Sequence, residues 1–86
     1  MELVEIIERQ GNQPKKIKLR EGSVEGVYYS ISYAARLWGV TTMTAHRWYD
    51  KGEVSGCVVN TSNDRIFVPE ETVEKLKPEN RYIKVY

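Results

Sequence analysis

The amino-acid sequence predicts one small α+β domain, because it alternates β-prone segments with short amphipathic helices. The chain has 86 residues, a length typical of a single domain. Two extended segments come first, two short helices around a glycine follow, and a second β-prone pair precedes a third helix. Hydrophobic residues make up 41% of the chain and aromatic residues 10%, as in ordinary globular proteins, so disorder is not expected.

Charge and cysteine content restrict the classes of function. The formal net charge is +1, from 13 basic and 12 acidic residues, so any nucleic-acid binding must come from a local patch. Cys57 is the only cysteine, which excludes an internal disulfide and favours a cytoplasmic location. The start MELVEIIERQ carries acids where a signal peptide is basic, and no apolar run reaches the roughly 20 residues of a membrane span. We therefore expect no membrane partner.

The first part of the chain, residues 1–27, is predicted to consist of extended segments. Residues 3–9 and 15–20 flank a turn at residues 11–14, and KKIKLR alternates polar with apolar residues, as half-buried strands do. LVEIIERQ also fits the start of a short helix, but we prefer a hairpin. A further short strand is predicted at residues 27–31.

A first helix is predicted to begin at Ser32, a residue type that suits an N-cap. Gly39 is expected to end this helix in a left-handed conformation. Its apolar face, at helical spacing, comprises Ile31, Ala34, Ala35 and Trp38.

A second helix is predicted between an N-cap at Thr41 and a stop at Gly52. One face carries Thr44, Ala45, Trp48 and Tyr49, and the other carries Thr42, Met43, His46, Arg47 and Asp50. We expect the first of these faces to pack in the core and the second to remain outside.

The last part of the chain is predicted to hold a hairpin and a helix. Residues 57–59 and 65–68 are β-prone and flank the turn-rich loop NTSND. Pro69 suits the first turn of a helix and Pro78 would end that helix. The tail RYIKVY, within residues 78–86, alternates again and is a candidate strand.

Two short helices around a glycine turn, then a hairpin and a helix, is the order of a winged helix-turn-helix domain. The stretch YSISYAARLWGVTTMTAHRWYDKGEV, followed by DRIFVPEETVEKL, resembles the excisionase-like and MerR-like winged-helix family of DNA-binding domains. The resemblance covers residues 28–77, which we predict to be the DNA-binding domain. It implies that the second helix enters a major groove and that the hairpin, the wing, contacts the neighbouring backbone or minor groove.

The resemblance also implies a set of DNA-binding residues. They are Thr41, Thr42, Met43, His46, Arg47 and Lys51 on the second helix, Asn63 and Arg65 in the wing, and Tyr28 and Ser30 near the first helix. Two features depart from the family pattern: Asp50 and Asp64 would repel phosphate, and the wing loop lacks the usual glycine and arginines. No length is available for the dimerising helix of MerR-type regulators or for a recombinase catalytic segment.

Structural roles compete with these assignments. We expect Trp38 and Trp48 in the core, and we expect His46 to be neither a metal ligand nor part of a catalytic pair with Cys57. Arg47 could instead pair with Asp50 on the helix surface. Arg65 could instead brace Glu53 or Glu71, and the strip of Lys15, Lys16, Lys18 and Arg20 fits a solvated strand face better than a phosphate track.

We therefore predict sequence-specific binding of double-stranded DNA, without enzymatic activity or a cofactor, as a transcription regulator or an excisionase-like recombination accessory factor. Few phosphate contacts imply weak binding to a single site. We accordingly expect self-association or cooperative assembly on DNA, through the N-terminal segments or the tail, since strand edges can join another chain. The alternatives are a protein-interaction module that has lost DNA binding, and the DNA-reading piece of a larger recombinase.

Overall fold

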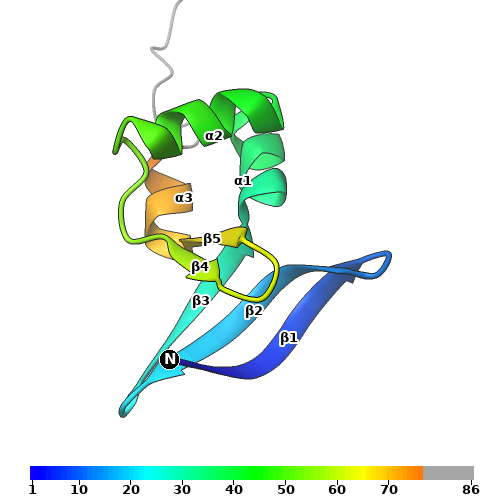
Figure 1. Ribbon diagram of the computed structural model, residues 1–86, viewed down its shortest axis with the longest axis vertical. Helices are drawn as coiled ribbons and strands as arrows, with labels where there is room; N and C mark the ends of the chain where they lie inside the picture. The colour runs from blue at the N-terminus through cyan, green and yellow to red at the C-terminus, as the bar shows by residue number, and fades with distance from the viewer. Residues whose placement is uncertain (77–86) are drawn as a thin grey trace, which may run out of the picture.

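A computed structural model describes residues 1–76 and confirms the α+β class, with a five-stranded antiparallel sheet and three helices in this range. The elements are β1 (Glu2–Gln10), β2 (Gln13–Glu21), β3 (Val24–Ser30), α1 (Ile31–Trp38), α2 (Thr42–Asp50), β4 (Val58–Asn60), β5 (Arg65–Pro69) and α3 (Glu70–Leu76) (Figure 1). The tail expected to form a strand lies outside the described residues, as does Pro78. None of the described helices is long and apolar enough to cross a membrane.

The sheet joins the N-terminal segments to the rest of the chain. Its strand order is β1-β2-β3-β5-β4, so β3 lies between the β1–β2 hairpin and the β4–β5 hairpin. The hairpin prediction for the first two segments is confirmed over the helical alternative. The expected boundary between residues 27 and 28 falls inside β3, which pairs with β2 along Val24–Tyr29. The N-terminal segments and the following residues therefore share one sheet.

The helices pack on one face of the sheet. α1 and α3 contact β3 and β5, and α2 packs against α1 (Figure 1). Trp38 lies at the meeting point of the helices: it is 1% exposed, and its Nε1 donates a hydrogen bond to the Val73 carbonyl oxygen at 3.0 Å. Its ring centroid is 5.5 Å from that of Trp48 on α2. The structure thus confirms Trp38 as a core residue and places the partly buried Trp48 against the core.

The opposite face of the sheet carries apolar side chains that no helix of residues 1–76 covers. Ile17 pairs with Tyr28, one residue before the core residue Tyr29, and successive residues of a strand point to opposite faces. The face lines a hollow of about 630 Å³, here called the apolar hollow, bordered by Leu3, Ile6, Ile17, Leu19, Val58 and Phe67, among others. β1 follows this face along a bent course, because its register with β2 shifts at three points (Figure 1).

The helix starts correct two predictions. Ser30, not Ser32, caps α1: its backbone is extended, and its hydroxyl oxygen accepts a hydrogen bond from the Tyr33 N–H at 3.3 Å. Pro69 is the last residue of β5 rather than the first turn of a helix, because it pairs with Tyr28 and α3 begins one residue later. Local preference alone could not separate positions so close in sequence.

The turn between α1 and α2 forms as predicted. Gly39 adopts a left-handed φ of 73°, and its N–H donates to the carbonyl groups of the last turn of α1. Thr41 caps α2, and Gly52, with φ 78°, directly follows its C-cap.

Candidate nucleic-acid interface

The outer face of α2 is built as the helical spacing predicts. Ala45 is fully buried against α1, and this fixes the rotation of the helix about its axis. Thr42, Met43, His46 and Arg47 are consequently exposed, Met43 to 66%. These four side chains present hydroxyl, thioether, imidazole and guanidinium groups on one surface.

The ends of α2 hold two of the other expected residues. The Thr41 hydroxyl accepts a hydrogen bond from the Thr44 N–H at 3.2 Å and donates one to the Thr44 hydroxyl at 3.0 Å. Lys51 is the C-cap and is exposed. Thr41 therefore positions the start of the helix, and its hydroxyl is engaged there, whereas the Lys51 ammonium lies in solvent.

Arg47 does not form the ion pair with Asp50 that was considered as its alternative role. Within residues 1–76 it forms no ion pair with Asp50 or any other carboxylate, and its Nη2 lies 3.8 Å from the Met43 Sδ. A thioether is a weak acceptor, so no group within residues 1–76 neutralises the charge of this exposed guanidinium.

The loop between β4 and β5 is shaped by its own hydrogen bonds. The Asn60 side-chain oxygen accepts from the Ser62 N–H at 2.9 Å, and the Asn63 side-chain oxygen accepts from the Arg65 N–H at 3.0 Å. Asp64 takes a left-handed φ of 58°, which Asp tolerates better than most residues. Arg65 braces neither of the expected glutamates, since it has no ion pair in the described part of the chain.

The structure brings four of the expected residues to one hollow of about 350 Å³, here called the α2 hollow. It is lined by Gln13, Ser30, Ile31, Ser32, His46, Asn63, Asp64, Arg65 and Ile66. His46 comes from α2, Asn63 and Arg65 from the β4–β5 hairpin, and Ser30 from the start of α1. The outer face of α2 and the expected wing are therefore neighbours in space.

Five lining residues were not among the expected site residues: Gln13, Ile31, Ser32, Asp64 and Ile66. Ser32 was assigned to the N-cap, and its true place in the first turn of α1 leaves it exposed at the α2 hollow. Gln13 follows a turn that the sequence indicates. Its position beside α2, about 30 residues later in the chain, depends on tertiary packing that no local pattern predicts.

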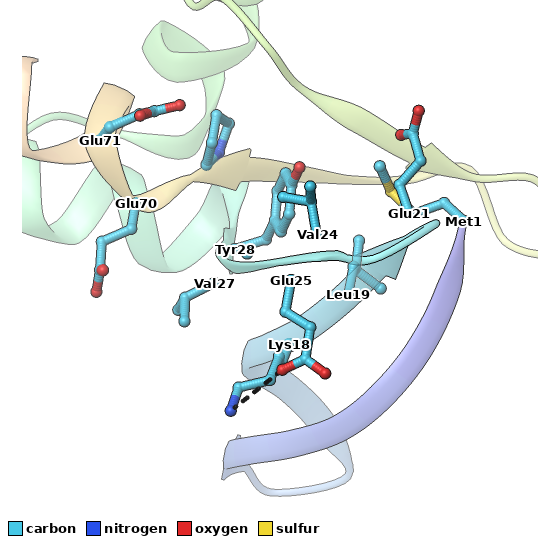
Figure 2. Close-up of a pocket in the computed structure, with 12 residues that line it drawn as sticks. Met1, Lys18, Leu19, Glu21, Val24, Glu25, Val27, Tyr28, Glu70 and Glu71 are labelled. Atoms are coloured by element: carbon cyan, nitrogen blue, oxygen red, sulfur yellow. Dashed lines mark ion pairs between the residues drawn. The ribbon is translucent and has the colours of Figure 1, made fainter.

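Tyr28 lies in a different place from the other candidates. It borders a hollow of about 800 Å³, the acidic hollow, which also includes Glu21, Glu25, Glu70 and Glu71. Figure 2 shows these glutamate side chains pointing in different directions rather than toward one centre. No group of three or more His, Cys, Asp or Glu residues suited to a metal ion occurs within residues 1–76. The carboxylates of these four glutamates would repel phosphate, so the acidic hollow does not extend the candidate interface.

The basic strip of β2 is largely neutralised by glutamates. The ion pairs are Lys15–Glu8 at 3.2 Å, Lys18–Glu5 at 3.6 Å, Lys18–Glu25 at 4.0 Å, Arg20–Glu2 at 2.9 Å and Arg20–Glu25 at 3.7 Å. This arrangement agrees with the solvated strand face favoured by the sequence.

Cys57 is unsuited to chemistry with His46. Burial raises the pKa of the Cys57 thiol to about 11, and its Sγ donates a hydrogen bond to the Val54 carbonyl oxygen at 3.6 Å. The thiol is therefore protonated at neutral pH, and a protonated thiol is a poor nucleophile and metal ligand.

Comparison of the chain with protein-family models, with curated proteins and with solved structures finds no match.

Proposed function

We propose that the protein binds double-stranded DNA sequence-specifically, as a winged helix-turn-helix domain with α2 in the major groove and the β4–β5 loop as wing. The observation that carries the proposal is the α2 hollow, where His46 of the exposed α2 face lies with Asn63 and Arg65 of the loop. A helix and an adjoining loop can then engage a groove and its backbone together.

The exposed groups of α2 match the edges of base pairs in a major groove. Arg47 can donate two hydrogen bonds to the O6 and N7 acceptors of guanine, and the Thr42 hydroxyl can pair with several bases. Met43 offers an apolar surface to a thymine methyl group. In this proposal Arg47 contributes most of the sequence preference, because its charge is not neutralised within the described residues.

The phosphate contacts are few. Arg65, Asn63 and Ser30 border the α2 hollow, but Asp64 does as well. Each neutralised phosphate adds to affinity through counterion release, so a single copy should bind weakly and with a shallow salt dependence. This supports a role that uses several copies, as in transcription regulation or the accessory side of recombination.

β1 is the surface we propose for association of copies. It is an edge strand of nine residues, and Leu3, Val4 and Ile7 are exposed on it, Leu3 to 55%. Its three glutamates pair with cations of β2, so within residues 1–76 the start and middle of the strand carry no unpaired charge, and Arg9 lies near its far end. Exposed apolar edge strands pair readily with other chains.

Selection from a pool of random duplex DNA, at moderate and at high salt, tests the proposed function. A recovered motif that survives high salt supports sequence-specific reading, and repeats at regular spacing would support assembly. Recovery of no motif, with binding that disappears as salt rises, would contradict it.

A variant assigns the binding to α2. Arg47→Ala should lower affinity for the recovered site by about tenfold or more, since a good arginine–guanine pair contributes about 1–3 kcal/mol of discrimination. Lys75→Ala, an exposed lysine of α3, is the matched control and should leave affinity unchanged. Circular dichroism should show both variants folded.

Asp64 supports a second candidate function, a protein-interaction module. Its carboxylate lines the α2 hollow beside Arg65, where a phosphate would otherwise be held. If this function is the correct one, Arg47→Ala and the wild type will show the same weak, motif-free DNA binding.

A further inference from the structure

We propose that the end of the β1–β2 hairpin, residues 9–13, is a second phosphate-binding element that contacts the DNA backbone beside the proposed wing. This inference rests on the proposed function and extends it to residues that lie outside the resemblance to winged-helix domains. The first observation is positional. Gln13 lines the α2 hollow together with His46, Asn63 and Arg65, so the hairpin end borders the surface that we propose meets DNA.

The hairpin end also projects toward solvent. In Figure 1 the turn between β1 and β2 extends past the β4–β5 loop, on the side of α1 away from α3. Gly11 makes this turn with a φ of 62°, and residues 9–13 are all exposed. A duplex lying against α2 and the wing would therefore meet this turn as the next element of the same surface.

The position of the hairpin end is held by contacts to the core side of the molecule. The Lys15 Nζ lies 4.4 Å from the centroid of the Tyr33 ring on α1, and the Lys16 Nζ lies 5.4 Å from that of Tyr29 on β3. These two rings contact one another, with centroids 5.5 Å apart. Cation–π contacts of this kind add to the β2–β3 pairing, so the turn is placed relative to α1 rather than hinged freely.

Ion pairing leaves the hairpin end more positive than the rest of the hairpin. Glu2, Glu5 and Glu8 of β1 each pair with a cation of β2, whereas Arg9 has no ion pair within residues 1–76. The other side chains of the turn with polar groups, Gln10, Asn12 and Gln13, are uncharged amides that can donate hydrogen bonds to phosphate oxygens. At the other end of the sheet, Glu21 and its neighbours form the acidic hollow.

This distribution of charge selects the partner. Phosphate is favoured at the end with Arg9 and disfavoured at the end with the acidic hollow, so a duplex on the α2 side gains from the hairpin end. An arginine and amides without an apolar anchor suit a backbone, and such contacts carry no sequence preference of their own. The hairpin end would therefore lengthen the footprint and add affinity without changing the preferred site.

The test compares two charge reversals in the full chain, Arg9→Glu at the hairpin end and Lys75→Glu on α3. Both residues are exposed, and both substitutions change the net charge by the same amount. Affinity for the selected duplex is measured over a series of salt concentrations, and the protected backbone is mapped by hydroxyl-radical footprinting. Asn12→Glu, at the turn itself, is a second variant that leaves the paired residues of β1 and β2 intact.

We expect Arg9→Glu to weaken binding by about tenfold, to reduce the slope of log affinity against log salt by about one, and to shorten the footprint at one side. Asn12→Glu should act in the same direction, and Lys75→Glu should do neither. An unchanged footprint and affinity in Arg9→Glu, while Arg47→Ala loses binding, would overturn the second contact and leave the proposed function intact. Equal losses in Arg9→Glu and Lys75→Glu would also overturn it. A wild-type chain that binds no duplex would overturn both proposals.

Discussion

Trp38 is the residue on which the helical layer depends most. It is buried between the helices, contacts the tilted Trp48 ring of α2 and donates its ring N–H to the Val73 carbonyl of α3. One side chain thus carries both the apolar contact that orients α2 and a hydrogen bond that satisfies a buried carbonyl.

Trp38→Phe should lower the free energy of unfolding by about 2–3 kcal/mol, because it leaves a cavity and removes the hydrogen bond to the Val73 carbonyl oxygen. Urea unfolding followed by circular dichroism measures this loss. Trp48→Phe is the matched control, and its cost should be smaller because Trp48 is only partly buried. Equal losses in the free energy of unfolding at the two positions would show that neither the hydrogen bond nor the deeper burial of Trp38 adds to stability.

The thiol of Cys57 offers a pH-dependent test of burial. Its pKa of about 11 lies above that of an exposed thiol, so at pH 8 alkylation by iodoacetamide should be on the order of a hundredfold slower in the native protein than in denaturant. The native state keeps this proton to higher pH than the unfolded state. The stabilising contribution is therefore present below the unfolded pKa and is lost as the pH rises toward 11. Similar alkylation rates in both states would contradict the burial of the thiol.

At the level of the elements, α1 and α2 act as a pair whose geometry is set by their ends. Ser30 and Thr41 each accept a hydrogen bond from one N–H in the first turn of their helix, and Gly39 supplies the left-handed residue between the helices. The buried Ala45 allows α2 to approach α1 closely. The caps and the turn set the ends of α2, and the packing of Ala45 sets its rotation. Together they leave the outer face of α2 exposed to solvent.

The correction at the start of α1 can be measured directly. Ser30→Ala removes the N-cap acceptor and should destabilise the protein by about 1 kcal/mol, whereas Ser32→Ala should change stability by less than about 0.5 kcal/mol. Chemical denaturation of both variants provides the comparison. A larger loss of stability in Ser32→Ala than in Ser30→Ala would show that Ser32 is the N-cap, as expected from the sequence.

At the level of the whole molecule, the helices within residues 1–76 cover one face of the sheet and leave the other face open. Helices pack over β3 and β5, while the apolar hollow lies on the other side and the apolar edge of β1 beside it. Leu3 and Arg9 are about 20 Å apart along an extended strand. Association through the start of β1 and DNA contact through its end are therefore compatible.

We expect Leu3→Lys to weaken self-association and, with it, cooperative binding to repeated sites, because it places a charge on the apolar edge. Sedimentation velocity over a range of concentrations measures association, and binding isotherms on repeated sites measure cooperativity. Val24→Lys, at an exposed valine of β3 rather than of the edge strand β1, is the control and should associate as the wild type does. A wild-type chain that stays monomeric on DNA with a non-cooperative isotherm would refute the assembly proposal.

Local sequence patterns predicted the presence of the helices, the two hairpins and the faces of α2, but not the first residues of α1 and α3. The spacing around Ala45, the threonine cap and the glycine turn depend on neighbours within a few residues, and all three are present as predicted. Pairing between strands that are distant in the sequence decided which of these elements lie side by side. Only the placement of β3 between β2 and β5 brings Gln13 to the same hollow as His46 and Arg65.

The strand pairing also determines which charged side chains form ion pairs, which the sequence alone does not show. It directs Tyr28 to the acidic hollow, and it couples the glutamates of β1 to the cations of β2 while Arg9 stays unpaired within residues 1–76. Helical periodicity and capping are short-range properties of the backbone, whereas strand order and ion pairing join residues far apart in the chain. The elements are therefore encoded locally, and their assembly into one surface follows from long-range packing.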